Sequence, residues 1–172
     1  MTQQLRFETL AAAHKRDDFT CGNQALDQWF HTRASQDQKR HVAQVFVALR
    51  DDRIVGFYSL SMFTLALDSL PAALARKLPK YDAIPAAIIG RLARAESERG
   101  QGMGGLLVAD AIKRVLAASE SVAAYAIVVD AKDDAAKHFY EGFGFIPLAS
   151  QPHRLFLLTQ TAAAGLAAAE RR

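Results

Sequence analysis

Two apolar runs in the first half of the chain, over residues 42–49 and 54–67, are rich in the β-branched and aromatic residues typical of strands. Asp51 and Asp52 lie between the runs and favour a turn, so the sequence predicts a hairpin. A short alternating stretch over residues 5–10 predicts a strand before it. Asn23 is suited to cap a helix that carries Leu26, Trp29 and Phe30 on one face.

The second half of the chain alternates between buried strands and helices. Residues 86–95 and 123–130 read as strands, and between them apolar residues recur at helical spacing from Met103 to Ala118. Asp133 or Asp134 is placed to cap a helix that reaches Glu141 and ends at Gly142. Residues 143–148 and 155–158 predict closing strands, which completes an α/β protein.

Length and composition bound the class of protein. The 172 residues correspond to one domain, which we expect over 1–160, followed by an Ala-rich tail over 161–172. No apolar run approaches the ~20 residues of a membrane span, and the start lacks the pattern of a secretory signal. Cys21 is the only cysteine, and no two histidines have zinc-ligand spacing. We therefore expect a cytoplasmic protein without a metal.

The charges are uneven along the chain. Residues 76–114 include eight basic residues and only four acidic ones. This excess suits a polyanionic ligand or nucleic acid, although an ordinary solvated surface would give the same pattern.

The sequence from Arg99 to Gly105, which we call the glycine loop, follows a predicted strand and opens a predicted helix. Glycines at such a turn let backbone N–H groups converge, and the first N–H groups of a helix have no internal partner. The helix dipole adds about half a positive charge there, so a pyrophosphate is the natural guest.

Three ligand-binding motifs compete for this loop. A Walker A loop would end in Gly-Lys-Ser/Thr, and this chain has Gly104-Gly105-Leu106 instead. The dinucleotide fingerprint matches through Gly100, Gly102 and Gly105, but it usually opens its domain, whereas here two or three strands precede it. A tight turn without a ligand would not need so many glycines.

The third motif is Arg99-x-x-Gly102-x-Gly104, which resembles the acetyl-CoA loop of GCN5-related N-acetyltransferases (GNAT). Downstream, residues 136–145 resemble the helix and closing strand of the same fold, with its Phe139-Tyr140 pair. Three further segments, 19–30, 90–93 and 129–132, together with Phe139-Tyr140, resemble the toxin branch of this family. One departure is Leu92-Ala93-Arg94-Ala95, where many members continue as Leu-Ala-Val-Asp.

The resemblance implies a mixed central sheet flanked by helices and acetyl-CoA as co-substrate. It implies acetylation of the α-amine of aminoacyl-tRNA, which stops translation, a ribbon-helix-helix antitoxin as partner, and a homodimer. A GNAT enzyme acting on a small amine or a protein N-terminus is the alternative. A non-catalytic binding domain and an oxidoreductase are more distant alternatives.

Several residues are expected to bind acetyl-CoA, the acetyl donor, or to act on it. Arg99 to Gly105 would supply N–H groups to the pyrophosphate, and the strand edge at Leu92 to Arg94 would pair with the pantetheine arm and the thioester carbonyl. Tyr140 would protonate the departing thiolate, since a phenol carries its proton at neutral pH. The expected cofactor-binding residues are Leu92, Ala93, Arg94, Arg99, Gly100, Gln101, Gly102, Met103, Gly104 and Gly105.

The acceptor side rests on charge. Basic side chains would contact tRNA phosphates and position the acceptor end. The candidates are Arg33, Lys39, Arg40, Arg76, Lys77, Lys80 and Arg91. Glu96, Glu98 and Asp130 are candidates for a general base by charge alone, and the weakly basic amine of an aminoacyl ester makes the need for a base modest.

Overall fold

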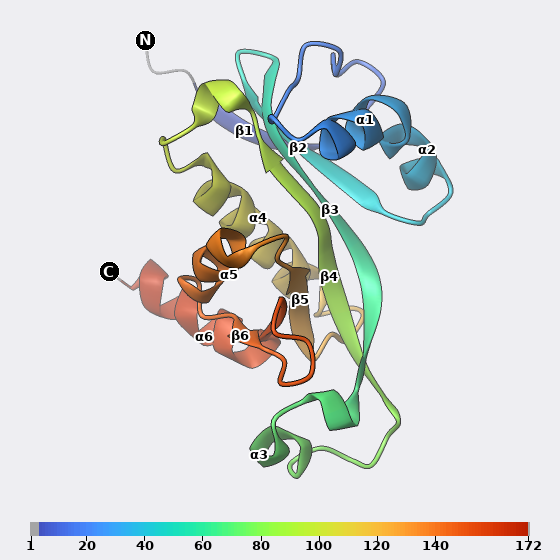
Figure 1. The fold of residues 1–172 in the computed structure, drawn as a ribbon, viewed down its shortest axis with the longest axis vertical. Helices are drawn as coiled ribbons and strands as arrows, with labels where there is room; N and C mark the ends of the chain where they lie inside the picture. The colour runs from blue at the N-terminus through green and yellow to red at the C-terminus, as the bar shows by residue number, and fades with distance from the viewer. Residues whose placement is uncertain (1–3, 172) are drawn as a thin grey trace. The chain divides into compact units, whose positions relative to one another are not determined.

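The computed structural model describes residues 4–171 and is an α/β fold with one seven-stranded sheet, whose strand order is β1-β2-β3-β4-β5-β7-β6 (Figure 1). The strands are β1 (Leu5–Thr9), β2 (Gln44–Arg50), β3 (Arg53–Ala66), β4 (Ala83–Arg94), β5 (Ala126–Asp130), β6 (Ile146–Pro147) and β7 (Arg154–Leu158). The helices are α1 (Gln24–Thr32), α2 (Ala34–Lys39), α3 (Ala72–Ala75), α4 (Met103–Ala118), α5 (Asp134–Glu141) and α6 (Thr159–Glu170), with two 3₁₀ turns, η1 (Leu67–Ser69) and η2 (Glu96–Glu98).

The chain divides into two compact units. The first contains the residues up to Ser61 together with Gly90–Ala111, and the second contains Met62–Ile89 and Ile112–Arg172. Residues 1–3 and 172 lie outside the described residues. The first three belong to the segment from which we expect no secretory signal, and residue 172 belongs to the predicted tail.

The first unit is organised around the β2–β3 hairpin, with β1 antiparallel to β2. Asp51 and Asp52 form its turn with φ of 48° and 63°, and two left-handed central residues match the twist of the strands that they join. Asn23 caps α1 by accepting a hydrogen bond from the N–H of Leu26. The core here is aromatic: the rings of Phe30 and Phe57 stack at 4.1 Å.

The second unit contains the parallel pairing of β4 with β5, in which Ala86–Ile89 face Ala126–Val129. Strand β7 runs antiparallel to β5, and β6 to β7. The core is mainly aliphatic and includes Ile84, Val128 and Leu148 around Phe156. Asp133 caps α5 through the N–H of Ala136, as the sequence predicted.

Most predicted elements are confirmed, and α4 has the predicted bounds. The strand predicted over 143–148 shortens to Ile146–Pro147, because the N–H groups of Phe143 and Gly144 donate back to the carbonyls of Tyr140 and Glu141 and keep these residues in the turn after α5. Gly142 follows α5 as expected, but its conformation is right-handed, and the positive φ of 95° falls at Gly144. The predicted tail forms α6 up to Glu170, and whether it stands apart from a domain over 1–160 stays a prediction.

Within residues 4–171, no helix has the length and apolar content that a membrane crossing requires.

Candidate active site

The glycine loop joins η2 to α4 in the first unit. Gly100 and Gly102 have φ of 78° and 77°, a conformation that residues with a side chain rarely adopt. A Cβ atom at either glycine would meet nothing within 4 Å. The backbone conformation, and not crowding by neighbours, therefore requires glycine at both positions.

The first backbone N–H groups of α4 precede the hydrogen-bond ladder of the helix. The N–H of Leu106 donates to the carbonyl of Gly102 at 3.2 Å, so the helical ladder begins there, and the N–H groups of Met103, Gly104 and Gly105 precede it. The Met103 side chain is fully buried and holds the first turn in place. With the exposed Arg99 beside these donors, the loop fits the pyrophosphate of a nucleotide cofactor.

An ion pair with a buried carboxylate holds the residue that precedes the glycine loop. Glu98 is 4% exposed, and its Oε1 lies 3.4 Å from Nε of Arg50 at the end of β2. Its second oxygen has no hydrogen-bond partner in the described part of the chain. This arrangement makes Glu98 a structural carboxylate, a role that its sequence neighbours do not reveal because Arg50 lies on a distant strand.

The neighbouring Glu96 packs against the loop that precedes α1. Its N–H donates to the carbonyl of Thr20 at 2.9 Å, and a Cβ atom at Gly22 would come within 2.6 Å of its Oε1. Glu96 is exposed, as are Gln101 and Gly102.

The predicted pantetheine-binding segment follows directly on the parallel ladder of β4. That ladder consists of Ala86–Ile89, so Leu92, Ala93 and Arg94 lie beyond it. The Ala93 side chain is buried, while Leu92 and Arg94 are partly exposed. The N–H of Ala95 donates to the carbonyl of Val55 at 2.9 Å and fixes the end of the strand.

Tyr140 lies on α5 in the second unit and is 8% exposed. Its ring makes edge contacts with Phe139 at 5.2 Å and Phe145 at 5.8 Å. Burial, with a smaller contribution from the charge of Asp130, raises the pKa of Tyr140 to about 12. The phenol is thus protonated at any physiological pH, and its hydroxyl makes no hydrogen bond to residues 4–171.

Asp130 ends β5 in a two-point ion pair with Arg154. Nε and Nη2 of Arg154 donate to its two carboxylate oxygens at 2.7 and 3.0 Å. The guanidinium of Arg154 also lies over the ring of Phe63, 4.9 Å from its centroid. Asp130 is held as the partner of an arginine, which leaves it poorly suited to act as a free base.

The basic candidates fall into two groups. Arg33, Lys39 and Arg40 lie at the ends of α1 and α2 and are exposed. Arg76, Lys77 and Lys80 are exposed on the connection after α3 in the second unit. Arg91 differs from the others, because it is partly buried on β4 with its guanidinium 4.2 Å from the centroid of the Trp29 ring.

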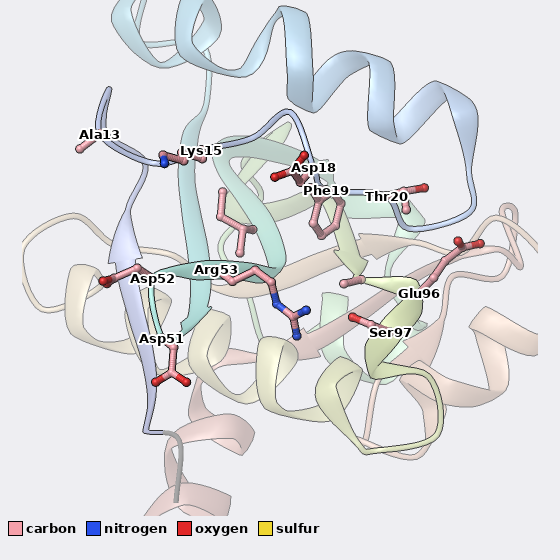
Figure 2. A pocket seen from close by; sticks show the side chains of 12 residues that line it. Ala13, Lys15, Asp18, Phe19, Thr20, Asp51, Asp52, Arg53, Glu96 and Ser97 are labelled. Carbon is pink, nitrogen blue, oxygen red and sulfur yellow. The ribbon is translucent and has the colours of Figure 1, made fainter. Parts of the chain in front are cut away.

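A cavity of about 510 Å³ lies beside the start of the glycine loop, in the first unit (Figure 2). Glu96 and Ser97 form one side of it, and the tip of the β2–β3 hairpin contributes Asp51, Asp52 and Arg53. No sequence pattern predicts this cavity, because its lining comes from separate segments with charges of both signs. No cluster of three metal-ligating side chains exists among the residues that the structure describes.

Comparison with known proteins assigns the fold to a family. Residues 41–147 match the model of the acetyltransferase (GNAT) domain. A tRNA-acetylating toxin of Mycobacterium tuberculosis (strain ATCC 25618 / H37Rv) is 36% identical over 146 residues, which cover 85% of this chain and 87% of that protein.

Solved structures agree with this assignment. AtaT complexed with acetyl-methionyl-tRNAfMet superposes with a TM-score of 0.88 at 29% identity, covering 95% of this chain and 99% of that one. A tyrosine-to-phenylalanine variant of AtaT bound to acetyl-CoA and the C-terminus of the antitoxin AtaR has a TM-score of 0.78 at 28% identity, with 92% and 96% covered.

The chain therefore belongs to the GNAT acetyltransferase family. Membership of this family favours the acetyl-CoA interpretation of the glycine loop over the dinucleotide interpretation of Gly100, Gly102 and Gly105. The fold class, the N-acetyltransferase activity and the acetyl-CoA co-substrate predicted from the sequence are confirmed at the level of the family.

Proposed function

We propose that this protein is a toxin that transfers an acetyl group from acetyl-CoA to the α-amine of aminoacyl-tRNA and thereby blocks translation. The observation that carries the proposal is the glycine loop at the start of α4, in a chain 36% identical to a tRNA-acetylating toxin. The loop accounts for the donor, and the relatives together with the exposed basic residues support the acceptor.

On the donor side, the backbone N–H groups of residues 99–105 hold the pyrophosphate, and Arg99 adds a positive charge. Leu92 to Arg94 pair with the pantetheine arm, and a backbone N–H of this segment donates to the thioester carbonyl as negative charge develops there. Bound acetyl-CoA supplies the activated acetyl group.

Tyr140 is the general acid of the proposed mechanism. As the amine forms the new amide bond, the carbon–sulfur bond breaks, and the phenol donates its proton to the departing thiolate. The phenol carries its proton at neutral pH, as a general acid must, and the rise of its pKa to about 12 makes it a weaker acid than an ordinary phenol. The amine loses its own proton to water, since Glu98 and Asp130 are both engaged by arginines.

On the acceptor side, Arg33, Lys39, Arg40, Arg76, Lys77 and Lys80 contact the phosphates of the tRNA. All six are exposed, and such contacts position an acceptor end without reading its sequence. The affinity for tRNA should accordingly fall as the salt concentration rises.

The proposal extends to partners. AtaT is solved with the C-terminus of the antitoxin AtaR, and we propose an antitoxin of the ribbon-helix-helix class for this chain. We also propose that the protein works as a homodimer, and in the cytoplasm, because its acceptor is found there.

The test is to incubate the protein with labelled acetyl-CoA and total charged tRNA. The label should enter tRNA and be released by mild alkali as an N-acetyl amino acid. Label that appears only on a polyamine or on protein N-termini would contradict the proposal and identify a GNAT enzyme with another acceptor.

A further inference from the structure

Arg91 is the one basic candidate whose backbone is fixed by a buried side chain. Its N–H donates to Oγ of Ser59 at 3.0 Å, and Ser59 is 2% exposed. A Cβ atom on the preceding Gly90 would lie 3.1 Å from the same oxygen, so this close approach favours glycine there. The position of Arg91 on β4 is therefore well defined.

The side chain of Arg91 has rigid support. Its guanidinium carbon lies 4.2 Å from the centroid of the Trp29 ring, and Trp29 is 7% exposed. Nε1 of Trp29 donates to Oδ2 of Asp37 at 2.9 Å, and its ring packs on Phe57 with centroids 5.9 Å apart. The guanidinium thus caps an anchored aromatic core.

The guanidinium of Arg91 contacts the Trp29 ring and has no carboxylate partner in the part of the chain that the structure describes. No carboxylate of residues 4–171 forms an ion pair with it, although the residue remains partly exposed. A planar cation that rests on a ring and lacks a carboxylate offers its other face to a flat ligand, and guanidinium planes stack well on nucleobases.

The position of Arg91 in the strand indicates which nucleobase of the tRNA it would contact. It directly precedes Leu92, where the segment proposed to hold the pantetheine arm begins. The acceptor atoms nearest the transferred acetyl group are the amino acid and the terminal nucleoside that carries it. The amine of the amino acid has no charge or ring with which a guanidinium could interact favourably. The terminal base is single-stranded and free to stack on it.

We propose that Arg91, supported by Trp29, is a positioning residue that stacks on the terminal nucleobase of the aminoacyl-tRNA. The inference rests on the proposed function. Because every charged tRNA ends in the same nucleoside, this contact strengthens binding of tRNA as a class and leaves the choice of amino acid to other residues.

Arg91→Lys separates stacking from charge, because lysine keeps the cation and loses the plane. In steady-state acetylation of charged tRNA we expect this variant to raise KM for tRNA about tenfold. Its kcat and its KM for acetyl-CoA should stay within twofold of the wild type. Trp29→Phe should give a smaller rise in KM, and Arg53→Lys, at another arginine of the same unit, should give none.

A second acceptor tests whether the base is the group recognised. The methyl ester of the same amino acid offers the amine without a nucleoside, so Arg91→Lys and the wild type should acetylate it equally well. Equal KM values for tRNA in the two proteins would overturn the inference in favour of a phosphate contact. An equal loss on tRNA and ester would overturn it in favour of a structural role, which thermal unfolding would show independently.

The two proposals fail in different ways. A wild-type protein that acetylates no charged tRNA overturns the proposed function and this inference with it. A wild-type protein that acetylates tRNA, with an Arg91→Lys variant that matches it, overturns the inference alone.

Discussion

The glycine loop and Tyr140 use opposite parts of the polypeptide. In the loop, Gly100 and Gly102 are exposed and lack side chains, so the work falls to backbone N–H groups. Tyr140 is buried, and in the proposed mechanism it acts through its hydroxyl. The loop should therefore tolerate changes of side chain but not of backbone conformation, whereas Tyr140 should not tolerate the loss of its hydroxyl oxygen.

The most severe test of this contrast is Tyr140→Phe, which removes only the hydroxyl. General acids contribute about 100-fold or more, so we expect kcat for acetyl transfer to fall by about that factor. The dissociation constant of acetyl-CoA, measured by calorimetry, should stay within twofold. Tyr125→Phe, on the same unit, is the matched control and should keep full activity; an active Tyr140→Phe would remove Tyr140 from the mechanism.

The next test concerns the anchor of the loop. Arg50→Ala leaves the buried Glu98 carboxylate without its cation, and we expect a loss of about 2–3 kcal/mol in unfolding free energy, less than for a fully buried pair because the Arg50 side chain is 25% exposed. Denaturant unfolding measures this loss. Adding Glu98→Gln removes the stranded charge and should recover part of the stability; a double variant as unstable as Arg50→Ala would show that the charge is not the cause.

A smaller effect is expected in the loop itself. Gly102→Ala finds space for its Cβ, but left-handed backbone costs a residue with a side chain about 1–2 kcal/mol. The affinity for acetyl-CoA should therefore fall about tenfold. Gly102→Asn should lose less, because asparagine adopts this conformation more readily. Gln101→Ala, with an exposed side chain, should bind as the wild type does.

The smallest effect concerns the proton of Tyr140. Asp130→Asn removes the lesser of the two causes that raise the pKa of this phenol, so the pKa should fall below about 12 while staying above its ordinary value. Ultraviolet titration of the variant against one that also carries Tyr140→Phe isolates the signal. An unchanged pKa would show that burial alone determines it.

The same pKa has a consequence for stability. The folded-state pKa of Tyr140 exceeds the ordinary value near 10, so the stability linked to its proton is complete below about pH 10 and is lost as the pH rises towards 12. Tyr140→Phe should lack that part of the alkaline destabilisation.

Local patterns were sufficient to predict several elements and the turn that the glycine loop makes between a strand and a helix. The α4 helix, the Asn23 cap and the Asp51–Asp52 turn depend on residues close together in the sequence, and the glycine loop carries its own conformational requirement. The conformation of the loop thus follows from the residues that form it, while its binding of acetyl-CoA stays a prediction.

Contacts between distant segments could not be predicted. The Arg50–Glu98 ion pair joins the end of β2 to η2, and the cation–π contact between Arg91 and Trp29 joins β4 to α1. The sequence ranked Arg91 and Glu98 by charge alone, alongside exposed residues such as Lys80. In the structure, Arg91 and Glu98 differ from the exposed residues by their burial. Burial depends on how the strands pack, and the sequence pattern does not predict the register between strands.

Trp29 is the only tryptophan of the chain. Its indole lies under a guanidinium and beside a carboxylate, two groups whose fields shift and quench emission from the ring. The tryptophan fluorescence of the protein therefore comes from one site, directly beneath Arg91. A ligand that binds at Arg91 should change this emission without any added label.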